Sequence, residues 1–187
     1  MTRSSQFLTV AIATDRDAGE LALLRTAVAE HLTRLHGIGH WSAPVTERGE
    51  LRSIKTSRIL IARDDETRII GTLRLATKKP WAIDKAYFST VPCPLYLTDM
   101  AVAPLLQHQG VGRRLIEAAK KVAAEWPADA VRLDAYNNAA GAGPFYAKCG
   151  FHEVGRVEYR GVPLIYFELL IHRAADAPPV DDVRTRE

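Results

Sequence analysis

The pattern of apolar and polar residues divides the chain into alternating strands and helices. Leucine and valine recur three or four residues apart between Leu21 and Leu35, which is the spacing of a helix with one apolar face. Asp17 and Glu20 resemble a capping box that begins this helix, and Gly37 is placed to end it. After it, residues 41–53 are less regular, with a proline at position 44 that is suited to open a short second helix.

The rest of the pattern predicts a mixed fold. Apolar or alternating runs predict strands over residues 7–13, 58–63, 68–77, 95–102, 130–135 and 162–171. A helix is expected from Val111 to Trp126, where Pro127 stops it, and a short helix before Gly150. This order predicts an α/β (α+β) fold with a twisted, mostly antiparallel sheet flanked by helices.

Length and composition indicate one domain. With 187 residues, 47% of them hydrophobic, the chain can bury a full core. We expect that domain to span residues 1–172 and the polar, proline-bearing segment 173–187 to be a disordered tail. The net charge of +3 suits an anionic ligand, but no basic block interleaved with aromatic residues indicates nucleic acid.

The sequence also favours a cytoplasmic location. No run reaches the roughly 20 apolar residues that span a bilayer, so we expect no membrane partner. The N-terminal residues lack the apolar stretch of a signal peptide. Cys93 and Cys149 form no closely spaced pair, so we expect both to be free thiols in a reducing compartment.

The segment Gln107–Gly112, with the sequence Gln-His-Gln-Gly-Val-Gly, carries the clearest chemistry. It lies between an apolar strand and a helix, and Arg113 and Arg114 follow it directly. Glycines let the backbone approach a ligand closely, and amides at a helix start attract anions such as phosphate. A P-loop would need Lys before Ser or Thr after the last glycine, and a dinucleotide loop would need glycine in place of Leu115, so neither fits.

The form Gln-x-x-Gly-x-Gly resembles the acyl-CoA pyrophosphate loop of GNAT superfamily N-acetyltransferases. Two other segments resemble that family in the same order, residues 97–104 before the loop and residues 145–151, Phe-Tyr-Ala-Lys-Cys-Gly-Phe, after it. The resemblance covers residues 7–171 and implies a three-layer GNAT fold. It further implies acetyl-CoA as co-substrate and direct attack by the amine of a small molecule or peptide in a ternary complex. Homodimers are frequent in the family, which leaves the oligomeric state open.

The resemblance also implies which residues contact the co-substrate. Backbone groups of Met100, Ala101 and Val102 would pair with the pantetheine where two strands splay apart, and an amide near Met100 or Ala101 would polarise the thioester carbonyl. Tyr146 matches the tyrosine that contacts the co-substrate and protonates the leaving thiolate, although a packed core aromatic is the alternative. The pyrophosphate would lie against Gln107, His108, Gln109, Gly110, Val111, Gly112 and Arg113.

Two positions depart from the family's pattern. Family members often carry Glu-Asp on the strand before the loop, where this chain has Thr98 and Asp99. Asp99 is thus a candidate general base, a holder of a relay water or a structural hydrogen-bond acceptor. The family's Asn seven residues before the tyrosine is Ala139 here, so we expect Asn138, ahead of Asn137, or else backbone groups, to make that contact.

Other chemistry-bearing residues have weaker patterns. The long connection 78–94 carries residues that either wall an acceptor pocket or cover the sheet: Trp81, Asp84, Tyr87 and Phe88. Three histidines lack an accompanying cysteine or carboxylate cluster, so we expect no metal: His31, His36 and His40. The predicted function is N-acetyl transfer, and the alternative left open by Thr98 is a non-catalytic acyl-CoA-binding regulatory module on the same fold.

Overall fold

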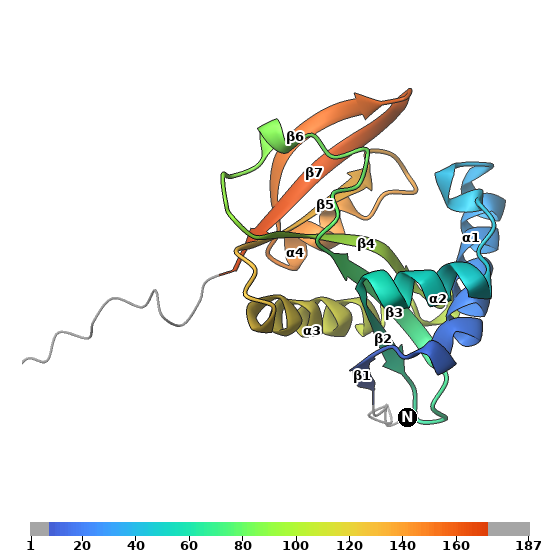
Figure 1. The fold of residues 1–187 in the computed structure, drawn as a ribbon. Coiled ribbons are helices and arrows are strands. Elements are labelled where there is room, and N and C mark those ends of the chain that lie inside the picture. The colour runs from blue at the N-terminus through green and yellow to red at the C-terminus, as the bar shows by residue number, and fades with distance from the viewer. Residues whose placement is uncertain (1–7, 172–187) are drawn as a thin grey trace, which may run out of the picture.

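A seven-stranded sheet in the order β1-β2-β3-β4-β5-β7-β6 organises residues 8–171, which the computed structural model describes (Figure 1). Neighbouring strands are antiparallel except β4 and β5, which run parallel. The strands are β1 (Thr9–Ile12), β2 (Arg58–Arg63), β3 (Ile69–Ala76), β4 (Pro94–Val102), β5 (Ala130–Tyr136), β6 (His152–Tyr159) and β7 (Val162–Leu170). The main helices are α1 (Ala18–His36), α2 (Glu47–Thr56), α3 (Val111–Glu125) and α4 (Gly143–Lys148). The predicted fold class is therefore confirmed.

Helices cover both faces of the sheet, and the alternation of β2 shows how (Figure 1). Leu60 and Ala62 are buried with α3 on one face, while Ile59 and Ile61 are buried with α1 on the other. Successive residues of a strand point to opposite faces, so a strand covered on both sides is apolar throughout. The outcome is three layers, with the sheet between α1 on one face and α3 on the other.

The connection between β3 and β4 packs against the sheet on the face opposite α3. Ile83 and Phe88 are buried there with Tyr96 and Tyr166. The Asp84 carboxylate accepts a hydrogen bond from the Ala86 amide at 3.0 Å and so caps a local turn. Of the residues singled out in this segment, Phe88 covers the sheet, whereas Trp81 is 85% exposed.

Three local predictions differ from the structure. The predicted capping box is wrong, because the Glu20 carboxylate accepts from the Ile69 amide at 2.6 Å, while that of Asp17 binds Thr14 and Arg63. These contacts attach the start of α1 to the β2–β3 hairpin instead. The second helix begins after Thr46, whose hydroxyl accepts from an amide of the first turn at 3.2 Å, and not at the earlier proline.

The strand β6 is absent from the sequence prediction. It pairs with β7 along its length, but the register shifts between Glu153 and Gly155. A bulge interrupts the alternation of side chains on which a strand is recognised. The tail expected from residue 173 lies outside the described residues.

Candidate active site

A cavity opens where β4 and β5 diverge. Their parallel ladder runs from Pro94–Ala130 to Tyr96–Arg132 and ends there. Beyond it, a cavity of about 400 Å³ lies between the two strands, α1 and the segment 40–45. Residues 97–101 of β4 and 134–136 of β5 line it, so Met100 and Ala101 lie in the splay, where the resemblance had implied them. Val102, the last residue of β4, pairs with Gly71.

A bulge in β4 shapes this wall of the cavity. Ala101 pairs with Thr72 and Thr98 with Arg74, so two β4 residues oppose one residue of β3. Asp99, one of these two, has a φ of 54°. A two-against-one bulge bends the strand and changes the direction of nearby side chains, and Asp is among the residues that adopt left-handed backbone most readily. The bulge directs β4 away from β5 at the level of the cavity.

The Asp99 carboxylate is held between two guanidinium groups. One oxygen lies 2.8 Å from Arg25 and the other 3.0 Å from Arg74. Arg25 also pairs with the buried Glu50 at 2.6 Å. Each charge in this network has an opposite partner, and both oxygens of the Asp99 carboxylate are occupied by arginine. The network ties α1 and α2 to the sheet beside the cavity.

Asp134, which the sequence patterns did not single out, is a second carboxylate of the cavity. It lies on β5 and lines the cavity together with Tyr136 and Tyr146. No ion pair to it occurs within residues 8–171. Burial raises the pKa of Asp134. The available signal was an acidic residue within a strand, flanked by the apolar Leu133 and Ala135.

Tyr146 reaches the same cavity from α4. Its ring is buried against Phe151 and Phe167, and its hydroxyl donates to the Met100 sulfur at 3.6 Å. Burial raises the pKa of Tyr146, and the nearby Asp134 adds to the shift. The phenol therefore keeps its proton at neutral pH and has a hydrogen to donate at the cavity wall.

The glycine loop follows β4 after a short 3-10 turn at Pro104–Leu106 and leads into α3. Gly110 has a φ of 90° and open space where a side chain would stand. A Cβ on Gly112 would lie 3.1 Å from the Met100 methyl carbon and 3.2 Å from the Phe145 ring, so a side chain here would require these neighbours to shift slightly. The first turn of an α-helix leaves its N–H groups without intrahelical acceptors, and the Arg114 N–H is the first to donate within the turn, to the Gly110 carbonyl.

The side chains of the loop brace it from within. The Gln107 amide donates to the Val102 carbonyl at 3.3 Å, and the Gln109 amide to the Leu105 carbonyl at 2.9 Å. His108 is exposed and has a φ of 61°. Val111, the first residue of α3, is buried in the core. In contrast, residues 108–110 of the loop and the two arginines, Arg113 and Arg114, are exposed. The loop thus fits an anionic group through free amides, glycine clearance and adjacent positive charge.

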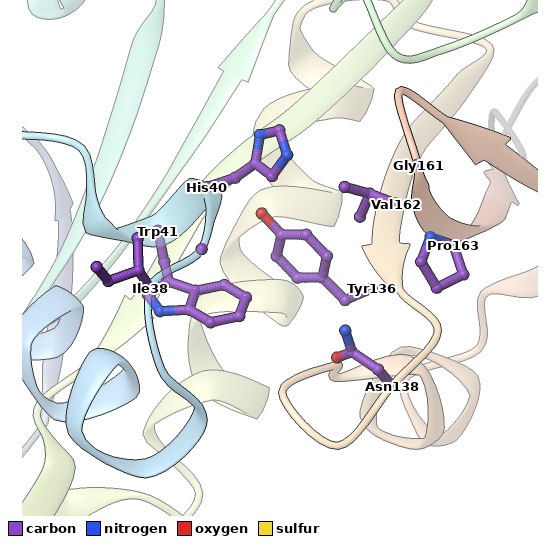
Figure 2. A pocket seen from close by; sticks show the side chains of 9 residues that line it. Ile38, His40, Trp41, Tyr136, Asn138, Gly161, Val162 and Pro163 are labelled. Atoms are coloured by element: carbon purple, nitrogen blue, oxygen red, sulfur yellow. The ribbon is translucent and has the colours of Figure 1, made fainter.

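Asn138 is not among the residues that line this cavity. Its side-chain oxygen accepts from the Ala140 amide at 3.0 Å, and the residue lines a second cavity beyond Tyr136, shown in Figure 2. Ala140 and Ala142, in contrast, line the first cavity with their small side chains. In this turn, residues 140 and 142, and not Asn138, are therefore placed to contact a co-substrate in the first cavity.

Metal sites and membrane-spanning helices are both absent from the described residues. No group of three or more His, Cys, Asp or Glu side chains within residues 8–171 is placed to hold a metal ion. Over the same residues, no helix is both long enough and apolar enough to cross a bilayer.

Comparison with known proteins identifies relatives. A family model described as an acetyltransferase (GNAT) domain matches residues 55–153, more than half of the chain. An acetyltransferase of the GNAT family from Streptococcus pneumoniae has a similar structure, with a TM-score of 0.68 and 20% identity over 88% of this chain and 99% of that chain. No curated protein matches the sequence significantly.

Two further solved structures share the fold. The protein yncA from Salmonella typhimurium, solved with its cofactor acetyl-CoA, matches with a TM-score of 0.66 and 17% identity over 91% of this chain and 99% of that chain. The ribosomal-protein-S18-alanine N-acetyltransferase from Escherichia coli matches with a TM-score of 0.66 and 17% identity over 92% and 99%. At such identities the likeness establishes the fold.

Proposed function

This chain belongs to the GNAT acetyltransferase family, and from that premise we propose that it transfers the acetyl group of acetyl-CoA to the amine of an acceptor in a ternary complex. The observation that carries the proposal is the convergence of three groups on one cavity. The end of β4 at Met100 and Ala101, the hydroxyl of Tyr146 and the carboxyl of Asp134 all line it. The glycine loop begins just beyond the end of the same strand.

The loop and the start of α3 would hold the diphosphate of the co-substrate. The first-turn amides of α3 present partial positive charge, and the Arg113 guanidinium adds a full charge beside them. Gly112 lets the start of α3 pack closely against Met100 and Phe145, and so near the end of β4. The exposed β4 edge in the splay would pair with the pantetheine as an added strand, and an amide near Met100 or Ala101 would polarise the acyl carbonyl. The co-substrate supplies the activated acyl group.

We assign the general base to Asp134 in preference to Asp99. An attacking amine must give up a proton, so the base needs a free carboxylate oxygen and a pKa suited to accepting it. Asp99 has both oxygens bonded to arginine. Asp134 lacks an ion pair among the described residues, and burial raises its pKa, which makes its ionised form the stronger base. Asp99 then serves to hold Arg25 and Arg74 in place.

Tyr146 would donate a hydrogen bond to the departing thiolate. Its hydroxyl is directed at β4, as its contact with the Met100 sulfur shows. A phenol whose pKa is raised by burial is protonated throughout the neutral range, so it can act as a donor in every turnover.

Calorimetry with acetyl-CoA, followed by measurement of free thiol released in the presence of amines, tests the proposal. We expect binding of acetyl-CoA and amine-dependent thiol release, with the acetylated amine identified by mass spectrometry. Binding without transfer to any amine would instead favour the regulatory acyl-CoA-binding module. Folded protein with no affinity for acetyl-CoA would overturn both functions.

A further inference from the structure

A second cavity of about 490 Å³ lies beside the first, beyond Tyr136. Residues 38–41, which follow α1, form one side, and the turn between β6 and β7 forms the other through Gly161, Val162 and Pro163. Figure 2 shows the Tyr136 ring between Trp41 on one side and Val162 on the other. Three distant parts of the chain therefore border this space, which is open to solvent.

The two cavities share an aromatic wall. His40, Trp41 and Tyr136 line both of them. The rings of Trp41 and Tyr136 meet edge to face, with centroids 5.2 Å apart and planes at 89°. A molecule that reaches the first cavity with one end can thus rest its other end against the same rings. Such rings offer large apolar contact with little loss of side-chain freedom.

The second cavity carries no formal charge in its lining. No Asp, Glu, Lys or Arg occurs among the described residues that line it. In the first cavity, Arg25 is already bonded to two carboxylates. A charged group placed in the second cavity would meet no opposite charge on its lining, whereas an apolar or aromatic body would pack against the rings. Ile38, which is 91% exposed, extends the apolar lining to the surface.

We propose that the acceptor is a primary monoamine with an uncharged, apolar or aromatic body. The amine lies at Asp134 in the first cavity, and the body lies against Trp41, Tyr136 and Val162 in the second. This inference rests on the proposed acetyl transfer. It disfavours acceptors that carry a carboxylate or a second ammonium at the far end.

Three amines with the same chain of methylene groups test the far end directly. Hexylamine ends in a methyl group, cadaverine in an ammonium and ε-aminocaproate in a carboxylate. With saturating acetyl-CoA, kcat/KM for hexylamine should exceed that for either charged amine by about tenfold or more. Phenethylamine should be used at least as well as hexylamine, because its ring can pack against the aromatic wall.

A charge-introducing variant tests whether the lining of the second cavity sets the preference for an uncharged far end. Val162→Asp introduces a carboxylate into the second cavity, so it should bring kcat/KM for cadaverine close to that for hexylamine. Leu23→Asp adds the same charge on α1 at a side chain that is 73% exposed and lines neither cavity, so it should keep the order of the parent protein.

The outcomes separate the acceptor class from the transfer reaction. Equal or better use of cadaverine or ε-aminocaproate by the parent protein would overturn the acceptor class and leave acetyl transfer standing. An unchanged order in Val162→Asp would also overturn it, provided that the variant unfolds at the parent's temperature. Bound acetyl-CoA without transfer to any of the four amines would overturn the acceptor class, and acetyl transfer itself would fall only if no other amine or peptide were acetylated either.

Discussion

The hydroxyl of Tyr146 lies 3.6 Å from the sulfur of Met100 and joins α4 to the end of β4 across the mouth of the splay. Met100 also packs against the glycine loop, since its methyl group stands 3.1 Å from where a Cβ of Gly112 would be. One methionine therefore contacts both the proposed proton donor and the proposed diphosphate loop. This arrangement links the position of the donor to that of the loop.

Replacing Tyr146 by Phe should lower kcat about 100-fold or more while acetyl-CoA affinity changes little. Only the hydroxyl is removed, and positioned proton donors contribute about 100-fold to 10,000-fold. Steady-state kinetics and calorimetry measure the two effects. Tyr159→Phe, at the end of β6 and outside both cavities, is the matched control. A kcat like that of the parent would remove Tyr146 from the mechanism.

Asp134 and Asp99 should respond differently to replacement by Asn. Asp134→Asn should lower kcat at least about 100-fold, because the proposed base is lost. In the parent protein, kcat/KM should rise with pH as Asp134 ionises, and burial places this rise above the ordinary pKa of an aspartate. The residual activity of the variant should lack this rise. Measuring kcat/KM of both proteins across this pH range tests the prediction.

Asp99→Asn should act mainly on stability. It leaves Arg25 and Arg74 without their shared carboxylate, and loss of one partner from a partly buried network costs about 1–3 kcal/mol. Urea unfolding measures the change. If Asp99→Asn removed the pH limb while Asp134→Asn kept it, the assignment of the base would be reversed.

Gly110→Asp should abolish acetyl-CoA binding. The new carboxylate would oppose the diphosphate at the start of α3, where the amides favour anions. Gly37→Asp controls for backbone strain and charge together, because Gly37 ends α1 with a φ of 80° and also has no atom near its Cβ position. Calorimetry should show parental affinity in the control. Retained affinity in Gly110→Asp would show that the diphosphate lies elsewhere.

The sequence predicted the fold well where elements follow simple periodicity. The helix after the glycine loop and the strands of the β2–β3 hairpin appear within one or two residues of their expected limits. The β6 strand was not predicted, because a bulge at Glu153–Gly155 interrupts its alternation of side chains. The capping box failed because Glu20 bonds to Ile69, a residue 49 positions away.

The candidate site was predictable only in part, because contacts between residues distant in the sequence leave no local pattern. The loop and Tyr146 belong to local motifs. Tyr146 lines the cavity at the splay, whereas the loop follows β4 outside the residues that line this cavity. Asp134 becomes notable only through its neighbours, because its burial and its nearness to Tyr146 depend on the meeting of β5 and α4. Likewise, nothing local indicates that Asp99 meets Arg25, which precedes it by 74 residues.

The buried pair of Arg132 and Glu168 should matter for stability. Its atoms are 2.9 Å apart, each side chain is 4% exposed, and Glu168 also accepts from the Ser89 amide. Glu168→Ala leaves a buried guanidinium without its partner, so unfolding should cost about 3–5 kcal/mol less. Glu153→Ala, which breaks an exposed pair with Arg156, should change it by less than about 1 kcal/mol. Urea unfolding compares the two, and equal effects would contradict a structural role for the buried pair.

Asp134→Asn should stabilise the fold at neutral pH even as it lowers activity. Burial raises the pKa of Asp134 in the folded chain, so between the unfolded and folded pKa values the folded state binds more protons and stability falls as pH rises. Above the folded pKa the full cost of the buried charge is present, and Asn removes it. Below the unfolded pKa of about 3.9 the carboxyl is neutral in both states, so the advantage of the variant should vanish. Thermal unfolding across this range measures the difference, and a variant less stable than the parent at neutral pH would show that the ionised Asp134 has a stabilising partner.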